Sequence, residues 1–78
     1  MTLYTVRSIK NRVREVSEAR RCPIAPAPQV PYVEFPIPRS YDIGAFMADL
    51  EKRLAYNPKL RVSLVMLRSR YRIRVEEK

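Results

Sequence analysis

The sequence predicts a small α+β domain, in which an antiparallel or mixed sheet of three or four strands packs with one or two amphipathic helices. Two patterns lead to this prediction. Apolar residues recur at helical spacing over residues 41–56, and polar and apolar residues alternate over residues 68–75. A chain of 78 residues makes one domain. Such a chain buries only about 60% of the surface that it exposes when unfolded, so its stability margin is small.

Residues 1–22 are expected to be a basic amphipathic N-terminal helix, regular over residues 6–21. Its β-branched residues weaken helix propensity, so tertiary packing must hold it. A short strand over residues 3–6 would add a fourth strand to the sheet. The predicted helix has one apolar stripe at a three-four-three spacing, which consists of Val6, Ile9, Val13 and Val16.

Residues 22–38 hold six of the seven prolines. Proline fixes φ and removes an amide donor, so residues 23–31 are expected to be an extended connector. Residues 32–78 then form a compact strand-helix-strand-strand unit within the same domain. Residues 32–37 alternate like a strand, and Pro36 confines this strand to an edge of the sheet.

A second helix is expected over residues 41–56, with an apolar residue at every third or fourth position. Ser40 or Asp42 would cap its N-terminus, because a short side-chain oxygen can accept from the first free amides. Asn57 and Pro58 mark its end.

The last segment, residues 60–78, changes the parity of its apolar residues. They fall on even numbers over residues 60–66 and on odd numbers over residues 71–75. One bulged strand and a hairpin around Arg68 and Ser69 both explain the change, and strand length favours the hairpin. The predicted core consists of Val33, Phe35, Ile37, Ile43, Phe46, Met47, Leu50, Leu54, Val62, Leu64 and Ile73.

The charge points to an anionic partner. The net charge is +8, with +4 over residues 1–22 (six basic, two acidic) and +5 over residues 59–78 (seven basic, two acidic). Nucleic acid and anionic membrane surfaces are the partners that such a balance favours, and a solvated basic surface is the alternative.

Arginine pairs with phosphate through a planar fork. The expected function is binding of DNA or RNA through the phosphate backbone, without base specificity. The expected contact residues are Arg68, Arg70, Arg72 and Arg74 in one row of a strand, helped by Arg7, Lys10 and Arg14 on the first helix.

Enzymatic chemistry is not expected. The chain has no histidine and one glycine, so it lacks an imidazole base, a P-loop and a dinucleotide fingerprint. We predict no catalytic residue, no metal site and no cofactor. Cys22 is the sole cysteine, which makes an intracellular, cytoplasmic location the default expectation. No apolar run reaches the roughly 20 residues of a membrane span.

A protein-interaction role is the alternative function. A small core, a proline-rich segment and an apolar strand over residues 60–67 would suit a subunit or inhibitor that docks on a larger viral or ribonucleoprotein complex. The same apolar strand would suit a homodimer. If the chain is instead a monomer, the N-terminal helix is expected to cover that face of the sheet.

Overall fold

The computed structural model describes residues 2–22, 24, 32–68 and 70–78. It has an α+β fold with the elements α1 (Leu3–Ala19), β1 (Tyr32–Ile37), α2 (Ile43–Arg53), β2 (Leu60–Met66) and β3 (Tyr71–Glu77). The three strands form one antiparallel sheet in the order β1-β3-β2. The predicted fold class is therefore confirmed. Most of the predicted connector, residues 23 and 25–31, lies outside the described residues.

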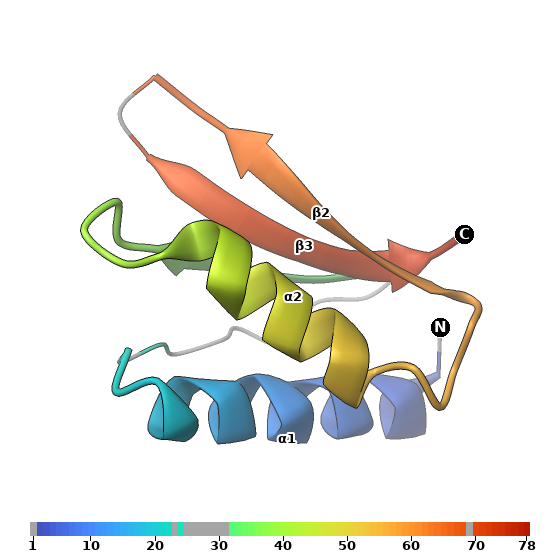
Figure 1. Cartoon of the computed structure of the whole chain (residues 1–78). Helices are drawn as coiled ribbons and strands as arrows, with labels where there is room; N and C mark the ends of the chain where they lie inside the picture. Colours follow the sequence, from blue (N-terminus) through green and yellow to red (C-terminus); the bar gives the residue numbers. More distant parts are fainter. Residues whose placement is uncertain (1, 23, 25–31, 69) are drawn as a thin grey trace.

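Both helices lie on the same side of the sheet, and no described helix covers its other, open face (Figure 1). The core fills the space between these two layers, and the rings of Phe35 and Phe46 meet there with centroids 6.0 Å apart. All four members of the predicted α1 stripe are buried, so α1 covers part of the sheet within one chain. The buried apolar side chains are Val6, Ile9, Val13, Val16, Cys22, Val33, Phe35, Ile37, Phe46, Leu50, Leu54, Leu60, Ile73 and Val75.

Helix α1 begins at Leu3, so the expected leading strand over residues 3–6 is wrong and the sheet has three strands. The Thr2 side chain caps the helix by accepting a hydrogen bond from the Thr5 amide at 3.1 Å. The helix ends at Ala19, two residues earlier than predicted, because Arg21 takes a left-handed conformation with φ 53°. The chain then turns, and the Cys22 amide donates to the Ser17 carbonyl at 2.9 Å.

Helix α2 is capped by Asp42, whose carboxylate accepts from the Ala45 amide at 3.0 Å. The helix ends at Arg53, and residues 54–56 continue as turns, so the predicted end at residue 56 was too late. Leu50 and Leu54 are buried as predicted, while Ile43 and Met47 pack against the core and remain partly exposed.

Strands β2 and β3 form a hairpin, which resolves the parity change. Leu67 and Arg70 exchange backbone hydrogen bonds of 2.8 and 3.3 Å at its closed end. Even-numbered residues of β2 lie opposite odd-numbered residues of β3, so both apolar sets face the helices. The prediction that Leu64 belongs to the core was wrong, since its side chain is 38% exposed, and Val62 is only partly buried. The hairpin extends beyond α2, so the far half of β2 is not covered (Figure 1).

The ladder pattern sets the direction of the backbone groups on both edges. The backbone bonds of Leu67 with Arg70, and of Lys78 with Lys59 (2.7 Å), show that odd residues of β2 bond to β3. In an antiparallel ladder the bonded pairs alternate, so even residues of β3 bond to β2 and odd ones bond to β1. Residues 32, 34 and 36 of β1 therefore point their backbone groups outward. Pro36 lies on this outer edge, where its missing amide costs no ladder bond, as the edge prediction requires.

Candidate nucleic-acid interface

The open face of the sheet carries Arg72 and Arg74, which the sequence predicted as contact residues. Both guanidinium groups donate to one carboxylate on the neighbouring strand. The Nε of Arg72 lies 2.6 Å from Oε1 of Glu34, and the Nε of Arg74 lies 2.8 Å from Oε2. The sequence analysis missed this acid. Its alternation with Val33 and Phe35 places it on the solvent side of β1, but only the register places it opposite Arg74.

The Glu34 carboxylate is held in its charged form. Partial burial would raise its pKa, but the hydrogen bonds and positive charges of Arg74 and Arg72 outweigh burial, and the net result is a pKa below the ordinary value. The hydrogen bond to Glu34 likewise raises the pKa of Arg74. The Arg74 guanidinium also lies over the Tyr32 ring, 4.5 Å from its centroid. Two cations and one anion leave this group with a net charge of only +1, and its geometry is fixed.

Arg68 and Arg70 belong to the connection between β2 and β3, because β3 begins at Tyr71. The expected single row of four arginines above the sheet is therefore wrong. Only Arg72 and Arg74 lie on the strand. Arg68 and Arg70 are both exposed, and neither pairs with an acidic side chain within the described part of the chain. Among the described residues, no acidic side chain offsets these two arginines at the tip of the hairpin.

Tyr71 lies on the helix side of the sheet, half-buried against the core, as its parity predicted. The Arg39 guanidinium lies 5.1 Å from the centroid of its ring. Tyr71 is therefore a packing residue, and no base could stack on the ring face that Arg39 occupies.

A second basic cluster lies on α1, where Arg7, Lys10 and Arg14 line a hollow of about 390 Å³ together with Asn11 and Ile24. Arg14 donates to the Asn11 side-chain oxygen at 3.4 Å. None of the three cations pairs with an acid among the described residues. The three residues that the sequence predicted as contacts on the first helix thus line one hollow.

The other flank of α1 is occupied by contacts with α2. Arg53 bonds to Asp49 at 3.0 Å and to Glu15 at 3.2 Å, and Glu15 also pairs with Arg12 at 2.7 Å. The hydroxyls of Ser8 and Tyr56 are hydrogen-bonded. These ion pairs join the two helices and offset the charges of Arg12 and Arg53.

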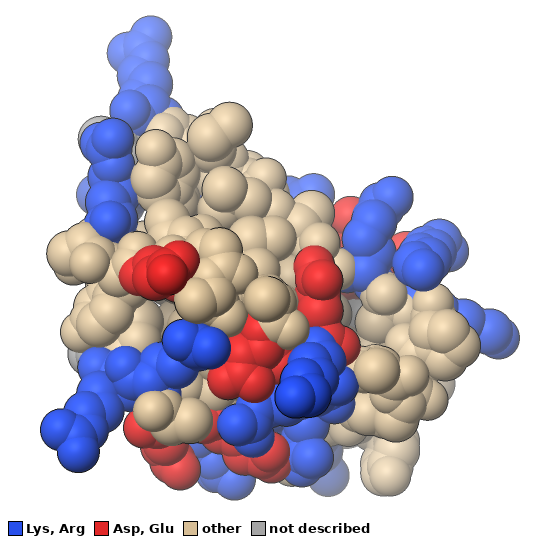
Figure 2. Space-filling model, in the orientation of Figure 1, with Lys and Arg blue, Asp and Glu red and all other residues tan. Residues whose placement is uncertain are grey.

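The two free basic clusters lie far apart on the molecule. Helix α1 is at one side of the fold and the β2–β3 connection is at the other (Figure 1). In the same orientation, Figure 2 shows basic and acidic side chains mixed over the helices, and an uncharged area between the hairpin and the helices. The predicted contact residues therefore form two separate sites rather than one surface.

The described residues contain no group of three or more metal-ligating side chains that could hold a metal ion. None of the helices in this part of the chain is long and apolar enough to cross a membrane. Comparisons with protein-family models, with curated proteins and with solved structures found no match to this chain.

Proposed function

We propose that this protein binds nucleic acid through the phosphate backbone, without base specificity. The observation that carries the proposal is the set of basic side chains that the described fold leaves without an acidic partner, in a chain of net charge +8. When such cations contact phosphates, they displace the small cations that are condensed on the nucleic acid. The release of these counterions drives association. The principal contacts are Arg7, Lys10 and Arg14 on α1 and Arg68 and Arg70 in the hairpin connection.

Arg72 and Arg74 take a secondary part. Their hydrogen bonds to Glu34 use one edge of each guanidinium and offset half of their charge. Each remains partly exposed, so a phosphate can still approach the network from solvent. Base-specific contacts are not part of the proposal, because Tyr32 and Tyr71 each already carry an arginine over the ring.

The test is a binding titration against single-stranded DNA, duplex DNA and RNA of equal length, at about 50 and 200 mM salt. Affinity should fall steeply as salt rises. The variant R7A/K10A/R14A should bind more weakly, and its slope of log K against log salt should be smaller by about 0.9 for each lost contact to duplex DNA. The control K52A/K59A/K78A removes the same charge from exposed lysines elsewhere, and should change the slope less.

Binding at low salt that ignores added salt would contradict the proposal. Equal losses in the two triple variants would show that net charge alone matters and would reject the α1 site.

A protein-interaction role is the second candidate. It is favoured by the exposed apolar side chains of Leu64, Met66 and Leu67 near the hairpin tip. Purification of tagged protein from its native host, with and without nuclease, separates the two functions. A stoichiometric protein partner that survives nuclease treatment would favour docking, and loss of every partner would favour nucleic acid.

A further inference from the structure

Within the described part of the chain, strand β2 presents an unpaired edge. It is the last strand in the order β1-β3-β2, and its even-numbered residues point their backbone groups away from β3. Seven residues without proline make up this strand. The opposite edge, on β1, is interrupted by Pro36, whose missing amide blocks pairing. Among the described strands, β2 is therefore the edge on which another strand can be added.

The same residues of β2 expose apolar side chains. Leu64 is 38% exposed and Met66 is 70% exposed, and Leu67 follows with 51%. The charge on this strand is Arg61, which pairs with Glu76 at 3.0 Å. An apolar edge with its charge already neutralised lacks the usual protection against strand pairing.

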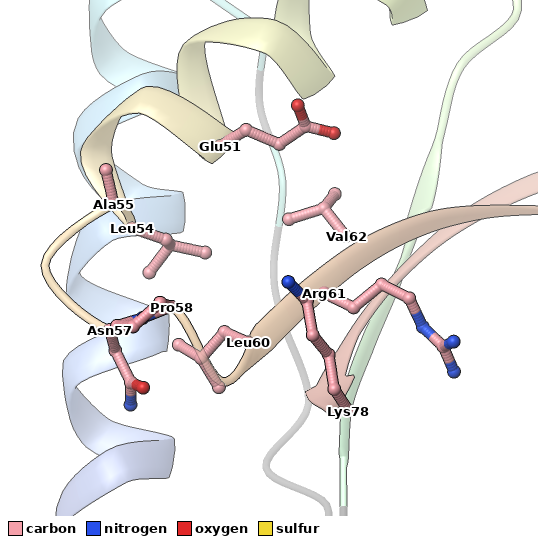
Figure 3. Close-up of a pocket in the computed structure, with 9 residues that line it drawn as sticks. All are labelled: Glu51, Leu54, Ala55, Asn57, Pro58, Leu60, Arg61, Val62 and Lys78. Carbon is pink, nitrogen blue, oxygen red and sulfur yellow. The ribbon is translucent and has the colours of Figure 1, made fainter.

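A hollow of about 450 Å³ opens beside the other end of β2. Figure 3 shows Leu54, Leu60 and Val62 around it, with the Glu51 carboxylate at one end. One half of β2 thus has exposed apolar side chains, and the other half borders a hollow with both apolar and charged residues in its lining. A two-fold axis through the middle of the strand would bring each half against the other.

We propose that two copies of this chain pair through β2, antiparallel, with Ser63 at the two-fold axis, to form a continuous six-stranded sheet. Ser63 is the middle residue of β2, so this register pairs the whole strand. Leu60 then lies opposite the partner's Met66, and Val62 lies opposite the partner's Leu64. These are all even-numbered residues, whose backbone groups point outward, so the hydrogen bonds between the strands can form.

The pattern favours a second copy over an unrelated strand because it is self-complementary. The apolar residues at even positions meet one another, and Arg61 meets the partner's Val65, so no two cations oppose each other within the strand pair. The partner's Met66 comes beside Leu60, which lines the hollow. An isologous interface requires this kind of self-complementarity.

Light scattering of the purified chain tests the association. The expected mass at micromolar concentration is twice the 9.2 kDa of one chain. Met66→Lys should give the monomer, because it places a charge in the interface at a position that is exposed in a single chain. The matched control is Leu3→Lys, also exposed but on α1, and it should remain a dimer. A single-chain mass for the wild type at every concentration would overturn the proposal.

Cysteine cross-linking tests the register. Ser63 forms a non-hydrogen-bonded pair with its own copy, where Cα atoms lie about 4.5 Å apart, a separation that a disulfide tolerates. Ser63→Cys should therefore cross-link on mild oxidation. Val65→Cys lies on the same face, but its two copies would be separated by roughly 13 Å, so it should not. Cys22 is 1% exposed, so the wild type supplies the background.

Cross-linking of Val65→Cys at least as fast as that of Ser63→Cys would overturn the pairing. None of these experiments contains nucleic acid, so their failure is distinct from failure of the proposed function.

Discussion

Glu34 and Arg74 lie directly opposite each other on β1 and β3, and the Nε of Arg74 donates a 2.8 Å hydrogen bond to Oε2 of Glu34. Arg72 donates to the other oxygen of the same carboxylate. Opposite charges in facing positions stabilise a pair of strands, so this network joins an edge strand to the central strand of the sheet. Arginines that resemble a ligand site in sequence thus have a structural part in the fold.

Replacing Glu34 by Gln should lower the free energy of unfolding by about 1–2 kcal/mol, because charged hydrogen bonds to two guanidinium groups become neutral ones. The Glu34 side chain is only 13% exposed, so hydrogen bonds from water compensate little for the charged hydrogen bonds that are lost. Urea unfolding at neutral pH measures the loss. Glu18→Gln, an exposed position on α1, is the control. If both variants unfold at the same urea concentration, the network does not stabilise the sheet.

The Glu34 network should also make stability depend on pH. The pKa of Glu34 is lower in the folded protein than its ordinary value of 4.5, so the folded state stabilises the ionised carboxylate. Its contribution is therefore complete above about pH 4.5 and is lost as the pH falls through the lower folded pKa. The difference in unfolding free energy between wild type and Glu34→Gln should shrink over that window. A difference that stays constant down to strongly acidic pH would contradict this assignment.

Leu50 is the central apolar residue of α2 and is fully buried. Leu50→Ala should lower the free energy of unfolding by about 2–5 kcal/mol, through the lost transfer free energy and the cavity that remains. Leu3→Ala, at an exposed position, should change it little. Thermal melts compare the two. A melt that Leu50→Ala leaves unchanged would remove α2 from the core.

Arg21 has a φ of 53°, in the left-handed region that favours glycine. Arg21→Gly should raise the free energy of unfolding by about 0.5–1 kcal/mol, because the left-handed conformation strains a side chain with a Cβ atom. The backbone carbonyl that accepts from the Tyr41 hydroxyl is kept. Arg20→Gly removes the same charge at φ −101° and should destabilise instead. Thermal melts of the two variants that shift in the same direction would argue against strain at Arg21.

Substitutions in the hairpin connection and on β3 should have different effects, the first on nucleic-acid binding and the second on stability. Arg68→Ala with Arg70→Ala should weaken nucleic-acid binding and reduce the salt slope for duplex DNA by up to about 1.8, with little change in melting temperature. Arg74→Ala should lower the melting temperature, since it removes a partner of Glu34. Titration and melting of the same samples check both. Unchanged binding after loss of Arg68 and Arg70 would exclude the hairpin connection from the interface.

The local patterns of the sequence predicted most of the elements. The alternation over residues 32–37 and 71–75 and the helical spacing over residues 42–54 are properties of neighbouring side chains, so the elements and their buried faces could be inferred. Pro36 predicted that β1 is an edge strand, and the reason is equally local, because proline has no backbone amide to donate to a second neighbouring strand. The start of α1 was missed because the Thr2 cap, which begins the helix at Leu3, carries no apolar signal.

The sequence by itself determined the composition of each face, and the tertiary structure decided what those faces meet. Glu34 lies 38 residues from Arg72 and 40 from Arg74, and only the strand order β1-β3-β2 brings them together. The same holds for Leu64, which has the parity of a core residue but lies beyond the reach of α2. Side-chain periodicity is set by local backbone geometry, whereas the pairing of strands and the cover of a helix depend on contacts between distant segments.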